Sequence, residues 1–216
     1  MDKSKSSLNR GLSLAELMVA LAILGVVIAM TLSFFNEMLT GTFEQEQKNE
    51  LNRSIRALMA DFSAQSRQAD YILLYKSFAP NDHKNTDDRL FEGKTGNFLL
   101  LVIQGEPTNQ QGLSNKRPIK KLIGYYLSSK ETNKPGPFKR FLIEYPKGTY
   151  NSPEDLIPKS EPQNTKILVH QARGLANDQA FYNLNNRNVI IDMSLSSGNE
   201  TKQYSHNFYF TLSPRE

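Results

Sequence analysis

An uncharged apolar run near the N-terminus constrains this chain more than any other feature. The run from Leu17 to Phe35 contains no charged residue and no proline. At a helical rise of 1.5 Å per residue, about 20 residues are long enough to cross a lipid bilayer. Residues 12–35 are therefore predicted to form a membrane-spanning helix.

A short basic leader precedes the apolar run. Residues 1–11 carry three basic side chains and one acidic side chain, so the leader is expected in the cytoplasm and the rest of the chain beyond the membrane. In an ordinary secretory signal the cleavage site follows the apolar region. Here the candidate site, between Gly11 and Leu12, precedes it. Cleavage at this site would leave the helix in the mature protein.

Glu16 is the one carboxylate near the start of the apolar helix. A charged side chain inside a membrane segment is costly and needs a partner. We expect that partner to be the cationic α-amine of Leu12 on a neighbouring subunit, which would neutralise Glu16 and fix the axial register between subunits. The simpler alternative is an uncleaved single-pass anchor that happens to carry a glutamate.

Gly11, Leu12 and Glu16 together resemble the type IV prepilin pattern. That pattern has a glycine before the cut, an apolar first residue, and a glutamate at the fifth position of the mature chain. The resemblance implies cleavage after Gly11 by a prepilin peptidase, N-methylation of Leu12, and assembly with similar subunits through the N-terminal helix.

The helical pattern continues through residues 36–70 as an amphipathic half of the same stem. Apolar residues at spacings of three and four predict a buried stripe. The stripe comprises Leu51, Ile55, Leu58, Met59 and Phe62. The side chains predicted to face away from it are Arg53, Arg56, Asp61 and Arg67. Residues 13–69 would form one long helix; the alternative is two helices hinged at Gly41.

Residues 71–216 read as a strand-rich head domain. The predicted strands are 71–78, 97–104, 119–127, 138–145, 166–170, 189–196 and 201–212, separated by clusters of Pro, Gly and Asn. Residues 119–127 alternate in a mostly half-buried pattern, and the last two strands form a hairpin with an apolar face. Strands that follow a single helix predict an α+β, pilin-like domain with an antiparallel sheet packed on the stem.

The order of three further segments restricts the resemblance to two groups of prepilin-like proteins. Residues 51–62, 125–127 and 208–212 are similar to the minor pseudopilin J family of type II secretion and to the W-type minor pilins. This implies a non-catalytic subunit without a cofactor, held in the bacterial inner membrane with its head in the periplasm, near the tip of a pseudopilus. Its implied partners are other pseudopilins or pilins, the prepilin peptidase, the inner-membrane assembly platform and membrane lipid.

The distribution of charge leaves nucleic-acid binding as a weaker alternative. Residues 12–70 hold four basic and seven acidic residues, and residues 71–216 hold nineteen basic and fourteen acidic residues. The candidate nucleic-acid contacts are Lys116, Arg117, Lys120, Lys121, Tyr125 and Tyr126, since basic residues beside aromatic rings can hold a single strand. However, Lys120 and Lys121 point to opposite faces of one predicted strand, which dilutes the patch.

Signals for enzyme chemistry are weak. The chain has no cysteine, and its three histidines, His83, His170 and His206, lack metal-ligand spacing. His206 is placed on the apolar face of the last strand. The segment 92–96 lacks the glycine spacing of a phosphate-binding loop and reads as a polar turn.

The acidic cluster of the head, at Asp82, Asp87 and Asp88, reads as a solvated loop, because its spacing matches no calcium-binding loop. The long polar loops 79–96, 104–118 and 146–163 are where we expect partner contacts.

Overall fold

A single helix leads from the N-terminal region into the head. The computed structural model describes residues 13–107, 117–128, 134–199 and 202–215. The chain divides into two compact units, Met1–Glu46 and Gln47–Glu216. Helix α1, Leu14–Ser66, runs unbroken for 53 residues, which confirms the predicted long helix. The alternative of two helices hinged at Gly41 is wrong, since Gly41 lies within α1.

The second half of α1 packs on the head as its apolar spacing predicts. Leu51, Ile55, Leu58 and Phe62 are all buried. Phe62 is fully enclosed, and its ring centroid lies 4.5 Å from that of Tyr125. Met59 does not belong to the stripe, because it is 37% exposed. Each residue advances about 100° around a helix, and this carries Met59 past the buried side.

Asp61 requires a second correction, because the sequence placed it on the outer face of the helix. Its carboxylate is half-buried, accepts a hydrogen bond of 2.7 Å from the hydroxyl of Tyr125, and forms an ion pair with Arg140. Burial, followed by the hydrogen bond to Asp61, raises the pKa of Tyr125 above its ordinary value. The helix is therefore tied to the sheet by polar contacts as well as by its apolar stripe.

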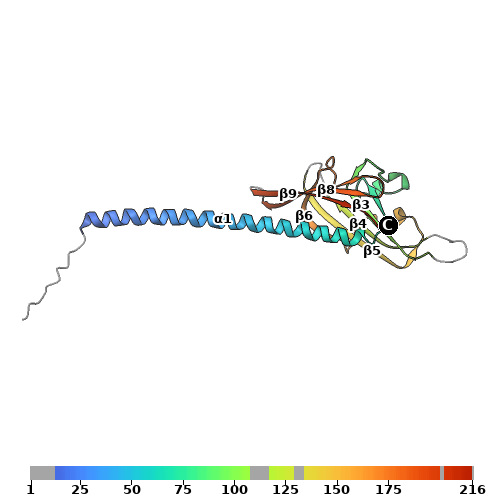
Figure 1. The fold of residues 1–216 in the computed structure, drawn as a ribbon, viewed down its shortest axis with the longest axis horizontal. Coiled ribbons are helices and arrows are strands. Elements are labelled where there is room, and N and C mark those ends of the chain that lie inside the picture. Colours follow the sequence, from blue (N-terminus) through green and yellow to red (C-terminus); the bar gives the residue numbers. More distant parts are fainter. Residues whose placement is uncertain (1–12, 108–116, 129–133, 200–201, 216) are drawn as a thin grey trace, which may run out of the picture. The chain divides into compact units, whose positions relative to one another are not determined.

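The strands of the described chain form one nine-stranded antiparallel sheet (Figure 1). Its main path runs in the order β1-β3-β4-β5-β6-β8-β7-β2, and β9 pairs with β8. The strands are β1 Tyr71–Tyr75, β2 Thr95–Gly96, β3 Phe98–Gln104, β4 Ile119–Leu127, β5 Gly136–Thr149, β6 Lys166–Gly174, β7 Phe181–Asn183, β8 Val189–Asn199 and β9 Lys202–Leu212. The sequence did not predict the short strands β2 and β7, which pair with each other.

The centre of the sheet is buried on both faces. Every residue of β3 from Phe98 to Val102 is fully enclosed. Leu99 and Leu101 join the core that contains α1, whereas Phe98 and Leu100 join a second core on the opposite face. In β4, every residue from Leu122 to Leu127 is buried, so the half-buried pattern predicted for residues 119–127 is wrong over most of this strand.

Two chain segments that the sequence reads as polar loops cover the second face. The segment after β1 contributes Phe78 and His83, and the short helix α2, Pro153–Leu156, is followed by the buried Ile157. Phe78 stacks on Tyr126, with ring centroids 4.4 Å apart. Parts of loops 79–96 and 146–163 thus belong to the core of the head.

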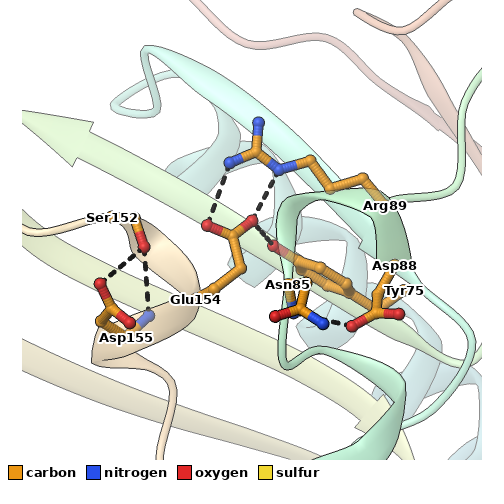
Figure 2. Close-up of polar contacts among 7 residues, drawn as sticks. All are labelled: Tyr75, Asn85, Asp88, Arg89, Ser152, Glu154 and Asp155. Atoms are coloured by element: carbon orange, nitrogen blue, oxygen red, sulfur yellow. Dashed lines mark hydrogen bonds and ion pairs between the residues drawn. The ribbon is translucent and has the colours of Figure 1, made fainter.

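A partly buried ion pair joins these two covering segments (Figure 2). The Nε atom of Arg89 donates to Oε1 of Glu154 at 2.6 Å, and the Nη2 atom donates to Oε2 at 3.1 Å. The hydroxyl of Tyr75 in β1 donates to the same Oε1 at 2.7 Å. We call these three residues the Glu154 cluster. It links β1, the loop after it and α2.

The Glu154 cluster sets the ionisation of its carboxyl group. The Glu154 side chain is 2% exposed. Its burial favours the neutral acid, but hydrogen bonds from Arg89 and Tyr75 outweigh burial and hold the pKa of Glu154 below its ordinary value. The anion is therefore the form that stabilises this side of the head.

We predict that Phe62→Ala lowers the free energy of unfolding of the head by about 3–5 kcal/mol, because it empties a fully enclosed ring site. The matched control is Phe43→Ala in the same helix, where the ring is 63% exposed and the change should stay within about 0.5 kcal/mol. Urea unfolding of the full chain in detergent, followed by tyrosine circular dichroism, measures both. Equal losses in the two variants would contradict the packing described here.

We also predict that Glu154→Gln destabilises the head by about 2–4 kcal/mol at neutral pH, because it leaves Arg89 without its buried anion. The folded-state pKa of Glu154 lies below the ordinary value of 4.5. The stabilisation is therefore complete above pH 4.5 and is lost as the pH falls through the folded-state pKa.

Urea titrations of the wild type and Glu154→Gln at several pH values should converge in acid. The neighbouring variant Asp155→Asn is the control, because Asp155 is exposed and its loss should change the unfolding free energy little. A difference between wild type and Glu154→Gln that stays constant with pH would show that the carboxylate does not act as an anion.

Candidate functional site

The start of α1 carries a reciprocal hydrogen-bonded cap. The backbone N–H of Ser13 donates to Oε2 of Glu16 at 2.9 Å, and the Ser13 hydroxyl donates to the same oxygen at 3.1 Å. In return the Glu16 N–H donates to the Ser13 hydroxyl oxygen at 3.3 Å. This is a capping box, which satisfies free N–H groups at the first turn of a helix.

The capping box gives Glu16 a structural role within its own chain. A negative charge also interacts favourably with the N-terminal end of the helix dipole. Neither effect supplies a full positive charge, so the carboxylate still lacks a cationic side chain or amine as its partner at the start of an apolar helix. The sequence carries a signal for this cap, since Ser13 stands three residues before Glu16 and just before the apolar run.

The first half of α1 presents apolar side chains on all sides. Within the described chain, every residue from Ser13 to Phe43 is exposed, and the large apolar side chains here range from Ile28 at 50% to Leu14 at 77%. An 18-residue window of the helix has a mean hydropathy of 2.6, which with its length is sufficient to cross a membrane. Lipid or other apolar helices are the surroundings that such a surface favours.

The predicted cleavage and methylation residues, Gly11 and Leu12, lie outside the described residues. Glu16 lies in the first turn of α1, at the end of the helix nearest to them. The structure therefore supplies the geometry of Glu16, and the cut at Gly11 remains a prediction from the sequence.

The predicted nucleic-acid contacts do not form a stacking surface. Lys116 lies outside the described residues. Arg117 pairs with Asp70 at 3.7 Å, and the Nζ atom of Lys120 donates to the carbonyl of Pro146 at 3.3 Å. The basic side chains that are described thus already have protein partners.

The two tyrosines proposed to stack on bases are both buried. Tyr125 is fully enclosed in the core against α1, and Tyr126 is 2% exposed in the core on the other face of the sheet. A buried ring offers no face to a base, so Tyr125 and Tyr126 are corrected from candidate contacts to core residues. The sequence pointed to them only because they lie near the basic residues.

The histidines of the described chain do not form a catalytic or metal-binding cluster. His83 is buried at 3% exposure, with its ring stacked on Phe78 at a centroid distance of 5.9 Å. His170 and His206 are exposed, so His206 does not lie in the apolar core. Within the described residues, His, Cys, Asp and Glu side chains do not gather in groups of three that could hold a metal ion.

Two carboxylates of the predicted acidic cluster, Asp82 and Asp88, accept hydrogen bonds from nearby residues. Asp82 accepts a hydrogen bond of 2.6 Å from the Ser77 hydroxyl. Asp88 accepts from the backbone N–H of Asn85 at 2.7 Å and caps a 3-10 turn (Figure 2). The segment 92–96 forms a turn that enters β2, as its polar composition predicted.

A hollow of about 550 Å³ lies beside the Glu154 cluster. Its lining includes His83, Lys84, Glu154, Asp155 and Lys159. The charges around it are of both signs, and Glu154 is already paired with Arg89. The hollow therefore has neither a paired nucleophile and base nor a single charge that would select a ligand.

Comparison with known families identifies the N-terminal segment. Residues 6–32 match the prokaryotic N-terminal methylation motif, and this span includes Gly11, Leu12, Ser13 and Glu16. No curated protein and no solved structure matches the chain. The N-terminus is therefore that of a type IV prepilin-like protein, followed by a long helix and an antiparallel sheet in a pilin-like arrangement.

Proposed function

We propose that this chain is a minor pseudopilin, a non-catalytic subunit that helps to initiate or cap a periplasmic pseudopilus for type II protein secretion. The observation that carries the proposal is the methylation motif over residues 6–32, joined to a helix whose first half is apolar and exposed on all sides. This arrangement supports a subunit that resides in the inner membrane and assembles through its stem.

In this proposal a prepilin peptidase cuts between Gly11 and Leu12, and Leu12 becomes the methylated N-terminus. The basic leader stays in the cytoplasm, and the head lies in the periplasm. The cut removes the residues before Leu12 but retains Ser13 and Glu16. The capping box at the start of α1 is thus available to the mature chain as well as to the precursor.

Glu16 then has two successive partners. Ser13 holds the carboxylate at the helix start through bonds to Oε2. The α-amine of Leu12 on an adjacent subunit supplies the positive charge that Ser13 lacks. Pairing a charge in an apolar environment is strongly favoured over leaving it unpaired. Only one axial offset between two stems satisfies this pair, so it fixes the register.

The choice of a type II secretion pseudopilus over a type IV pilus rests on the resemblance of residues 51–62, 125–127 and 208–212 to the minor pseudopilin J family. A W-type minor pilin would use the same helix chemistry in another filament. Burial of Tyr125 and Tyr126 removes the stacking residues from the competence alternative. The competence alternative predicts that competence genes lie next to this gene in the genome.

We predict that Glu16→Gln is processed at Gly11 but is incorporated into filaments at least about tenfold less than the wild type. Glutamine can still complete a capping box, so this variant removes the charge and keeps the helix cap. The converse variant, Ser13→Ala, removes the cap hydroxyl and keeps the charge. It should retain most of the incorporation.

The measurement is the amount of each variant in sheared or cross-linked filaments from cells that make the other subunits. Glu37→Gln is the matched control, since Glu37 lies further along the same exposed helix. Normal incorporation of Glu16→Gln, or equal losses for Glu16→Gln and Glu37→Gln, would refute the register role.

A further inference from the structure

The last strand, β9, presents a long free edge of the sheet. Within the described chain β9 pairs with β8 alone. The pairing runs without a register shift from Val189 opposite Leu212 to Asn199 opposite Lys202. In an antiparallel pair about half of the residues of an outer strand direct their N–H and C=O groups away from the neighbour. The outer side of β9 is thus a regular row of such groups.

From Tyr204 onward, this edge lacks several of the features that usually protect exposed strands. Natural edges are blunted by charged side chains, prolines, bulges, short length or a covering segment. From Tyr204 to Leu212, β9 has no proline and no formally charged side chain. Its pairing with β8 has no bulge. A strand of this kind favours pairing with another strand.

The opposite end of the sheet shows the contrast. Strand β1 has only five residues, and the backbone N–H of Leu90 donates to the carbonyl of Leu74 at 2.8 Å. The backbone of Gly96 in β2 also approaches β1 so closely that a Cβ there would clash with the carbonyl of Tyr75. The chain therefore covers the β1 edge with its own residues.

The far end of the β8–β9 hairpin extends past the strands beside it (Figure 1). Strand β6 pairs with β8 only at residues 193–195, and β7 pairs with it only at residues 189–191. Beyond these contacts the hairpin strands are paired only with each other. The free edge of β9 is thus accessible along a projecting ribbon as well as beside the core.

The two ends of strand β9 lie near the second half of α1. The Nζ atom of Lys48 lies 5.4 Å from the ring centroid of Tyr204, near the start of β9. Just past its end, the N–H of Arg215 donates to the carbonyl of Ala69 at 2.9 Å. The strand and the helix therefore run in the same chain direction. A subunit whose stem packs beside α1 would bring its own head near this edge.

The side chains of β9 define the chemistry of a partner strand. Phe208 and Leu212 are buried in the core against α1, and the half-buried Phe210 stacks on Phe208 at a centroid distance of 6.3 Å. The opposite face carries polar side chains and Tyr209, which is 64% exposed. An added strand would continue this alternation, with apolar residues beside Phe210 and few charges.

We propose that the free edge of β9 binds an extended strand from the head of a different pilin-type subunit, adding it to the sheet. The proposal rests on the proposed function, because stem packing is what brings that subunit to this edge. Backbone hydrogen bonds would provide affinity, and the strip beside Phe210 would select the apolar alternation of the partner.

The test replaces Tyr209 with a photoreactive benzoyl-phenylalanine in the full chain, in cells that make the complete apparatus. Tyr150, 38% exposed in the turn after β5, is the matched control position. We expect a cross-link from position 209 to a predicted strand of a second prepilin-type protein, at a yield at least about tenfold above that from position 150. A position-209 cross-link only to another copy of this chain, to a protein without a prepilin N-terminus, or to none would overturn the proposal.

Two proline variants test the backbone directly. Ser205 and His206 are adjacent and exposed, so one of their N–H groups points to β8 and the other points outward. The two variants are Ser205→Pro and His206→Pro. The one that keeps the wild-type unfolding midpoint is the one that removes the outward N–H group. It should lose the position-209 cross-link, and retention of the cross-link would contradict strand addition.

The same samples separate this inference from the proposed function. If Leu12 is the methylated N-terminus and Glu16 is required for filament incorporation, but position 209 gives no cross-link, strand addition fails alone. If the leader remains attached, the proposed function fails first.

Discussion

Helix α1 has to fit two different surroundings along its length, and the organisation of the chain follows from this requirement. In its second half, α1 buries a narrow stripe centred on Leu58 and Phe62 against the sheet, and polar bonds from Asp61 hold the edge of that stripe. In its first half, the same helix carries exposed apolar side chains on all sides. The first half suits a membrane or a bundle of similar helices, and the second half attaches a folded head to it.

The sequence predicts the parts of this arrangement that depend on local spacing. Leu51, Ile55, Leu58 and Phe62 are correctly placed because they recur at helical intervals within one segment. Strand β4 is predicted with its observed bounds, since turn-forming residues flank it. The Ser13–Glu16 cap is equally local and could have been found from its spacing.

The missed features depend on contacts between distant segments. Tyr125 and Arg140 reach Asp61 from 64 and 79 residues away, so nothing near Asp61 indicates that it is buried. The same holds for Glu154, whose partner Arg89 lies 65 residues earlier. The polar composition of loops 79–96 and 146–163 suggested that they are solvated. Instead, their few apolar residues and the Arg89–Glu154 ion pair cover the second face of the sheet.

Release of α1 as a mature pilin-type N-terminus can be measured from the mass of the N-terminal peptide of membrane-purified protein. We expect a chain that begins at methylated Leu12 in the wild type and that retains its leader in Gly11→Ala. Persistence of Met1 in both proteins would refute this processing and leave an ordinary membrane-anchored domain.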